Sequence, residues 1–318
     1  MYATPEFCPT HRVARTRRPG RFRRIGLGHR GSPAPTVSSV NLGRIGLWNP
    51  LRLFEQEGAR LPDTMAELDA SGFGAVWLGN GPAIMDVAAT LLDATSRLTV
   101  ATGIANIWAH PAAAIAARRS ELAGRHPGRL LLGLGNGPRE ASQWALSPYR
   151  RMVAYFDELD ALGAPAGSRV LAAAGPRMLA LAAERSIGAH PFLTTAEHTH
   201  LARTALGDGP LLAPELKVVL TADRAAAHAT ARQALGFYLA KRGYTANLRR
   251  LGFTDEDFAG GGSDRLVDAV VAWGDVETVL ERVGEHHQAG ADHVALQVLT
   301  SNPGLPLAEY RQLAAALR

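Results

Sequence analysis

Residues 98–137 of the chain read LTVATGIANIWAHPAAAIAARRSELAGRHPGRLLLGLGNG, and this stretch decides the fold class. Its two ends are apolar runs of the kind found in strands that are buried on both faces. The middle, rich in Ala and Arg, is typical of a helix. A strand, a crossover helix and a second strand form the unit that joins parallel strands. The stretch therefore predicts a parallel sheet.

The same alternation extends over most of the chain. Apolar runs predict strands at 43–48, 75–78, 98–107, 130–134, 169–174, 189–193, 216–220 and 292–299. Helical patterns separate them at 62–71, 84–94, 111–123, 152–162, 176–186, 196–205 and 224–239, and a last one lies at 307–317. Eight strands over about 275 residues favour a single parallel (β/α)₈ TIM barrel over a doubly wound open sheet.

Two segments do not fit the alternation. Residues 241–274 are too long for a simple connection and contain the glycine-rich stretch FAGGGS, so we expect a lid-like insertion between strands seven and eight. Residues 1–40 are rich in Arg, Pro and Gly and have no hydrophobic periodicity. We expect a basic, disordered N-terminal extension there, with the barrel spanning residues 41–318.

The charge distribution argues against a nucleic-acid partner. The whole chain carries +5, but residues 1–41 hold eight Arg and one acid, Glu6, and so carry +7. The remainder carries −2, the difference between +5 and +7, and has no basic footprint. Apolar stretches are too short to span a bilayer. The single cysteine, Cys8, permits no intramolecular disulfide, which fits a cytoplasmic location.

The active site of such a barrel lies at the C-terminal ends of its strands. The Gly175-Pro176 pair opens a helix, where exposed backbone N–H groups suit a phosphate, and Arg177 adds positive charge. Gly135-Asn136-Gly137 is a second glycine-rich turn. A Gly-Pro turn is more often only a turn, so neither motif is specific by itself.

Histidine and acidic clusters at metal-ligand spacing do not occur in the sequence, nor do the GxSxG and GKS/T motifs. We interpret His198 and His200, and likewise His286 and His287, as solvated residues on exposed helix faces. No metal is expected, and no catalytic residue is assigned. A cofactor that brings its own reactivity fits this chain better than a hydrolase mechanism does.

With these residues in view, the chain resembles the luciferase-like flavin and deazaflavin oxidoreductases. The resemblance lies in LTVATGIANIWAHPAAA (98–114) and GRHPGRLLLGLGNG (124–137). The stretches NLRRLGFT (247–254), SDRLVDAVVAWG (263–274) and AGADHVALQVL (289–299) resemble the subgroup that uses coenzyme F420.

The resemblance implies a bulge after strand three, with a non-proline cis peptide at Gly103–Ile104 that backs the central ring of the cofactor. It implies that Asn106 contacts that ring, that Gly135, Asn136 and Gly137 lie beside the cofactor's chain, and that Gly175, Pro176, Arg177 and Met178 bind its phosphate. Residues at other strand ends are the candidates for the substrate pocket: Trp48, Asn80, Trp108 and His110. For the two tryptophans, ordinary packing at the barrel rim is an equal alternative.

The sequence departs from that pattern where several deazaflavin relatives carry an acid and a histidine after strand two, because Gly79 and Asn80 stand there. Pro138 stands where some carry a carboxylate. We expect an enzyme that transfers a hydride between coenzyme F420 and a small organic substrate. One alternative is a two-component monooxygenase that uses reduced FMN, and the second is a non-catalytic ligand-binding barrel. Relatives are often dimers, so a homodimer is compatible with the resemblance.

Overall fold

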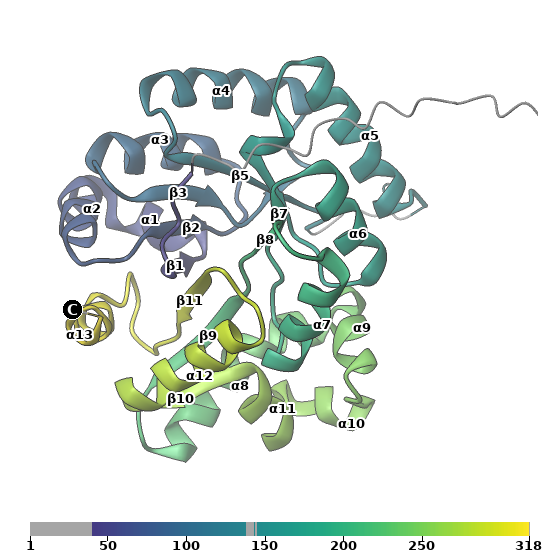
Figure 1. Ribbon diagram of the computed structural model, residues 1–318. Helices are drawn as coiled ribbons and strands as arrows, with labels where there is room; N and C mark the ends of the chain where they lie inside the picture. Colours follow the sequence, from purple (N-terminus) through teal and green to yellow (C-terminus); the bar gives the residue numbers. More distant parts are fainter. Residues whose placement is uncertain (1–39, 138–142, 144, 318) are drawn as a thin grey trace, which may run out of the picture. The chain divides into compact units, whose positions relative to one another are not determined.

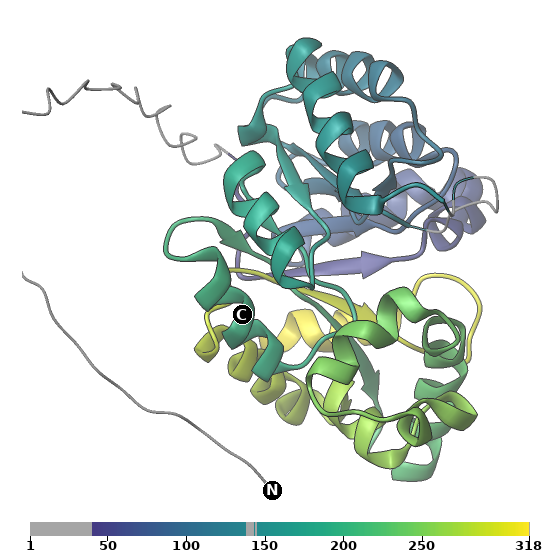
Figure 2. The same ribbon diagram turned by 90° about the vertical axis from the view of Figure 1, so that its right-hand side faces the viewer.

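The computed structural model describes residues 40–137, 143 and 145–317. Figures 1 and 2 show the helices on the outer face of a curved parallel sheet. The elements, in chain order, are β1 (Ile45–Asn49), α1 (Leu51–Glu57), η1 (Gly58–Arg60), α2 (Leu61–Ala70), β2 (Ala75–Leu78), α3 (Ile84–Ala94), β3 (Thr99–Thr102), β4 (Ala105–Asn106), α4 (Ala112–Arg125), β5 (Leu130–Gly135), α5 (Pro148–Ala161), η3 (Ala166–Ser168), β6 (Arg169–Leu171), α6 (Pro176–Arg185), β7 (Gly188–Ala189), α7 (Ala196–Leu206), β8 (Leu211–Leu212), β9 (Glu215–Leu220), α8 (Arg224–Leu239), α9 (Arg242–Arg250), α10 (Asp255–Phe258), η4 (Ala259–Gly261), α11 (Asp264–Val270), β10 (Val271–Gly274), α12 (Val276–Gln288), β11 (Val294–Val298) and α13 (Leu307–Ala316).

The strands close into a ring. Parallel pairing runs in the order β11, β1, β2, β3, β5, β6, β7 and β8. After Ala213 and Pro214, β8 continues as β9, which pairs in parallel with β11. The connecting residues contact both neighbouring strands, since Ala213 N donates to Ala189 O at 2.9 Å and Ala295 N donates to Pro214 O at 2.9 Å. With β3 and β4 counted as one position and β8 and β9 as another, the ring in the described chain has eight strand positions. The expected (β/α)₈ barrel is therefore confirmed.

The third strand is interrupted, as the resemblance implied. It runs as β3 to Thr102, passes through a cis peptide bond at Gly103–Ile104, and resumes as the two-residue strand β4. The second piece pairs with β5, with Ala105 opposite Leu134 and Asn106 opposite Gly135. The expected single strand over 98–107 is therefore two short strands with a bulge between them.

The stretch expected to be an insertion, 241–274, contains α9, α10, α11 and β10. The strand β10 was not expected. It pairs in parallel with the second half of β9, with Val271 opposite Lys217. Its run VVAWG directly continues a helix, so the sequence offers no glycine or proline to separate the two elements. The extension expected at 1–40 lies outside the described residues, apart from residue 40.

Three groups of buried side chains form the core. The largest lies between the strands and the outer helices. A second fills the barrel itself and includes Trp48, Trp77, Leu131 and Val170. The third joins the insertion to the strand it follows and includes Val219, Leu235 and Leu266. The alternation of inward and outward side chains along each strand separates the first two groups. Within the residues described, no helix is long and apolar enough to cross a membrane.

Candidate active site at the strand ends

The ends of strand one and strand three are in contact. The buried Trp48 side chain donates from Nε1 to the carbonyl oxygen of Gly103 at 3.0 Å. A Cβ added to Gly103 would lie 2.6 Å from Trp48 Nε1 and 3.2 Å from His190 Nε2. Glycine is therefore required at this position by close packing, and the bulge is fixed against the indole.

The next glycine-rich turn packs against the same bulge. A Cβ on Gly135 would lie 2.9 Å from Ile104 Cγ1, and one on Gly137 would lie 3.0 Å from Asn106 Cγ. The amide oxygen of Asn106 accepts a hydrogen bond from Trp108 N at 3.1 Å. Asn136 Oδ1 is buried and has no hydrogen-bond partner among the residues described. The structure thus brings the predicted residues of strands three and four together and leaves a buried acceptor beside them.

The start of α6 is the predicted phosphate turn. Gly175 is the N-cap residue, has extended backbone angles and makes no side-chain cap. Arg250, at the end of α9, brings its guanidinium to 3.5 Å from the place where a Cβ on Gly175 would lie. The guanidinium of Arg177 instead lies 4.3 Å from the centre of the Tyr149 ring. The cation nearest Gly175 therefore comes from the insertion, and sequence reasoning did not find it.

The residues predicted to line the substrate pocket lie farther apart than those of the glycine-rich turns. Trp108 is half-buried and packs against the outer core, whereas Trp48 belongs to the barrel interior. The carbonyl oxygen of His110 accepts from the Tyr155 hydroxyl at 2.9 Å. Asn80 is exposed. Whether Trp108 serves only packing or also lines a pocket stays a prediction.

Two histidines that sequence reasoning overlooked lie inside the barrel. His190 stacks on Trp77 with ring centres 4.1 Å apart, and its Nδ1 lies 2.6 Å from Ala213 O. Trp77 Nε1 donates to Nε2 of His293 at 3.0 Å. Burial lowers the pKa of both imidazoles to about 4. Because Nδ1 of His190 faces a carbonyl, the neutral ring carries its proton there, and Nε2 presents a lone pair toward Gly103.

A buried ion pair lies on the same barrel wall. Lys217 Nζ donates to Glu215 Oε1 at 2.8 Å, and both side chains are fully buried. The ammonium lies 3.9 Å from the centre of the Phe192 ring and 4.9 Å from that of Tyr238. Phe192 in turn contacts Trp48, with ring centres 5.2 Å apart. The spacing of two residues between Glu215 and Lys217 could have revealed this pair, since alternate residues of a strand share one face.

Two predictions about histidines were wrong. His198 is buried, with Nε2 at 2.8 Å from Ala174 O, and His286 is buried, with Nδ1 at 2.9 Å from Thr199 Oγ1. The cause is helix packing. His198 lies on α7 and His286 on α12, and α7 contacts both α6 and α12, so these two side chains are buried between helices. His200 is exposed, as expected. No group of three or more His, Cys, Asp or Glu in the described chain is arranged to hold a metal ion.

The fold is a (β/α)₈ barrel whose strand ends carry closely packed glycines, with Arg250 of the segment 241–274 beside Gly175. Residues 45–162 match the family model of the luciferase-like monooxygenases. The resemblance to luciferase-like enzymes expected from the sequence is thereby confirmed over residues 45–162, and with it the expectation of an enzyme. No curated protein is similar enough in sequence to match the chain.

Several solved structures share the fold. An F420-dependent secondary alcohol dehydrogenase in complex with an F420–acetone adduct is similar, with a TM-score of 0.65 and 14% identity over 86% of this chain and 97% of that one. The coenzyme F420-dependent tetrahydromethanopterin reductase of Methanopyrus kandleri has a TM-score of 0.63 and 16% identity, over 85% and 96%. The oxygenating constituent of 3,6-diketocamphane monooxygenase from Pseudomonas putida, in complex with FMN, has a TM-score of 0.60 and 14% identity, over 86% and 96%.

Proposed function

We propose that this protein transfers a hydride between coenzyme F420 and a small organic substrate at the C-terminal ends of its strands. The observation that carries the proposal is the start of α6, where Gly175 makes no side-chain cap and Arg250 lies against it. An uncapped helix start attracts anions, and an adjacent guanidinium strengthens that attraction. The phosphate of a flavin or deazaflavin is such an anion.

The other residues present fit the same group. The bulge at Gly103–Ile104 offers a surface for the flat ring, beside Asn106. The unpartnered oxygen of Asn136 offers an acceptor for the cofactor's hydroxylated chain. A bound deazaflavin supplies the hydride-transferring ring, so the protein has to bind and orient it and exclude water. In this proposal the substrate side of the ring is lined by Trp48, Asn80, Trp108 and His110.

F420 is preferred to FMN because its tail adds carboxylates to the phosphate. Arg177 and Arg250 are both exposed cations near the start of α6, and such an arrangement suits an extended anionic tail. Two of the similar structures are F420-dependent enzymes, which favours the same choice here. The FMN-bound relative supports the alternative of a two-component monooxygenase.

Binding of F420 and of FMN to the purified protein tests the proposal. We expect F420 to bind more tightly than FMN, as measured by calorimetry. Arg250→Ala is expected to weaken F420 binding about tenfold or more, since a hydrogen bond to a charged group contributes about 1.5–3 kcal/mol. Arg242→Ala removes the same charge from the other end of α9 and is expected to leave the affinity within about twofold.

The other outcomes separate the alternatives. Tighter binding of FMN would favour the monooxygenase, and binding of neither cofactor would favour a non-catalytic barrel. An equal effect of the two arginine substitutions would remove the α6 turn as the phosphate site. We also propose that the insertion, residues 241–274, acts as a lid, since it supplies Arg250 to the turn.

A further inference from the structure

Lys217 is an unusual residue in this chain. Of the 34 Lys and Arg residues only two are lysines, Lys217 and Lys241. Lys241 is near the surface, with Nζ over the Phe237 ring, whereas Lys217 is fully buried within the barrel. Arginine stays protonated at every accessible pH, but a lysine can give up its proton. A chain that uses arginine almost everywhere thus has its one buried amine on the wall of the barrel.

The surroundings of Lys217 are polar on one side and aromatic on the other. Glu215 Oε1 accepts a hydrogen bond from Lys217 Nζ at 2.8 Å. The rings of Phe192 and Tyr238 lie against the ammonium. Gln297 pairs with Lys217 in register across β9 and β11, and its buried Oε1 has no hydrogen-bond partner in the described part of the chain. Burial lowers the pKa of the Lys217 ammonium, an effect that Glu215 opposes. Such an environment favours proton release.

The same ion pair contacts the segment that carries Phe192, whose ring is only partly buried. Glu215 Oε2 accepts from the backbone N–H of Leu193 at 3.2 Å. Leu193 has a φ of 55°, the only positive φ of a non-glycine residue among those described. Strained backbone of this kind persists only when its surroundings enforce it, and it concentrates at functional sites. The ring of Phe192 thereby lies between Lys217 and Trp48. The indole of Trp48 in turn donates a hydrogen bond to Gly103 O in the bulge.

We propose that Lys217 is the proton donor of the reaction, acting on the carbonyl oxygen of a flat, ring-sized ketone or aldehyde. This rests on the proposed function, which supplies the hydride from a reduced deazaflavin. The substrate takes the place of the Phe192 ring, between the indole of Trp48 and the ammonium. Lys217 therefore fills the role left open by Gly79 and Asn80 at the end of strand two.

The carbonyl carbon gains the hydride, the π pair of the C=O bond moves to oxygen, and that oxygen takes a proton from Lys217 Nζ as the N–H bond breaks. The products are an alcohol and the oxidised cofactor, and the neutral amine regains a proton from solvent. Besides Glu215, the titratable groups nearest Lys217 are Tyr238 and, against Tyr238, Tyr244. Burial raises the pKa of both phenols, so they stay neutral.

The two lysines allow a direct test by NMR. Protein labelled with ¹³C at lysine Cε is expected to give two lysine signals, which Lys241→Arg assigns. Acetophenone, a flat ketone of the proposed size, is expected to shift the Lys217 signal and leave that of Lys241 in place. Lys217 is also expected to lose its proton at a lower pH than a fully solvated lysine does. An unchanged Lys217 signal at saturating acetophenone would overturn the proposal, whatever cofactor binds.

Variants provide the second readout. Lys217→Arg keeps the charge but cannot release the proton, and the double variant Lys217→Met with Glu215→Gln leaves no unpaired buried charge. Both are expected to bind F420 within about twofold of the original protein and to reduce acetophenone at least about 100-fold more slowly in a single turnover. Lys241→Arg is the control and should retain the rate.

Retention of the rate by Lys217→Arg would show that the ion pair is structural, and circular dichroism would identify a variant that fails to fold. The two proposals fail separately. Absence of F420 binding by the unmodified protein contradicts the proposed function. F420 binding without acetophenone reduction contradicts the role of Lys217 alone.

Discussion

At the scale of single residues, glycines at the strand ends are set by what they touch. Gly103, Gly135 and Gly137 have no room for a Cβ, because an indole, an isoleucine and an asparagine side chain occupy that space. Gly175 differs, since its nearest neighbour is the flexible guanidinium of Arg250 at 3.5 Å. Three of these glycines therefore serve packing within the bulge, and the fourth leaves the helix start open.

Gly103→Ala is predicted to destabilise the protein. The added methyl would lie 2.6 Å from Trp48 Nε1, so the indole must move and its hydrogen bond to Gly103 O is strained. Overpacking of this kind costs about 1–3 kcal/mol. Urea unfolding should therefore show a lower free energy of unfolding.

The matched control is Gly124→Ala in α4, where a Cβ meets nothing within 4 Å. That change should raise stability by about 0.5–1 kcal/mol, because alanine favours a helix more than glycine does. Equal effects of the two substitutions would contradict the packing argument.

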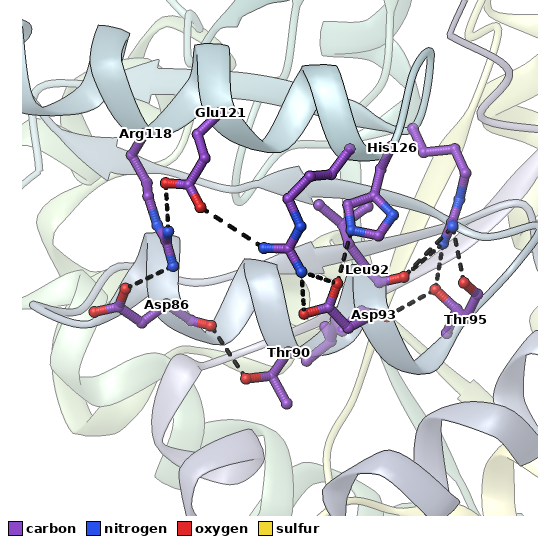
Figure 3. A network of polar contacts seen from close by, with 11 residues as sticks. Asp86, Thr90, Leu92, Asp93, Thr95, Arg118, Glu121 and His126 are labelled. Carbon is purple, nitrogen blue, oxygen red and sulfur yellow. Dashed lines mark hydrogen bonds and ion pairs between the residues drawn. The ribbon is translucent and has the colours of Figure 1, made fainter.

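At the scale of elements, polar contacts join α3 to α4 on the outside of the barrel. Figure 3 shows Arg118 between Asp86 and Glu121, and His126 beside Asp93. The distance from His126 Nε2 to Asp93 Oδ1 is 2.8 Å. Most of these side chains are well exposed to solvent, and exposed ion pairs contribute little to the stability of the fold. Arg129 differs, because it donates to the backbone carbonyls of Thr95 and Leu98, at 2.8 Å and 3.1 Å. It fixes the turn between α3 and β3.

Arg129→Met is accordingly predicted to cost about 2–3 kcal/mol, since it leaves those carbonyls without their charged donor. Arg125→Met removes a more exposed arginine that bonds Asp93 and should cost less than about 1 kcal/mol. A higher salt concentration should reduce the contribution of Arg125 to the free energy of unfolding and leave that of Arg129 unchanged. The comparison is made by urea unfolding at two salt concentrations, and a larger loss for Arg125 would show that the exposed network dominates.

At the scale of the whole molecule, buried histidines make stability depend on pH. Burial lowers the pKa of His190, His286 and His293 from 6.5 to about 4. Below pH 6.5 the unfolded chain takes up protons that the folded protein does not accept until about pH 4. The free energy of unfolding should therefore fall as pH is lowered from about 6.5 to about 4, by up to about 3 kcal/mol per histidine.

Urea unfolding at several pH values measures that slope. His293→Gln should reduce the slope, since it removes one of the buried histidines whose pKa is lowered. The exposed His200 is the control, and His200→Gln should leave the slope unchanged. A flat profile between pH 6.5 and 4 would mean that these histidines are solvated in the folded protein.

The alternation of the barrel's strands and helices and the bulge at Gly103–Ile104 could be predicted from the sequence, whereas the strand β10 could not. Apolar runs and helical periodicity are local signals, and the resemblance at residues 98–137 located the bulge. The turns at Gly135–Gly137 and Gly175–Met178 also follow from local sequence. Their roles toward a cofactor remain proposals.

Only the tertiary structure decided which distant residues meet. Arg250 is 75 positions from Gly175 in the sequence, and nothing local indicates that α9 brings it to the start of α6. The same holds for Phe192, which lies between Trp48 and Lys217, and for the inward turn of His198 and His286. Periodicity tells which side of an element is apolar, but the packing of other elements decides which polar side chains are buried and what they contact.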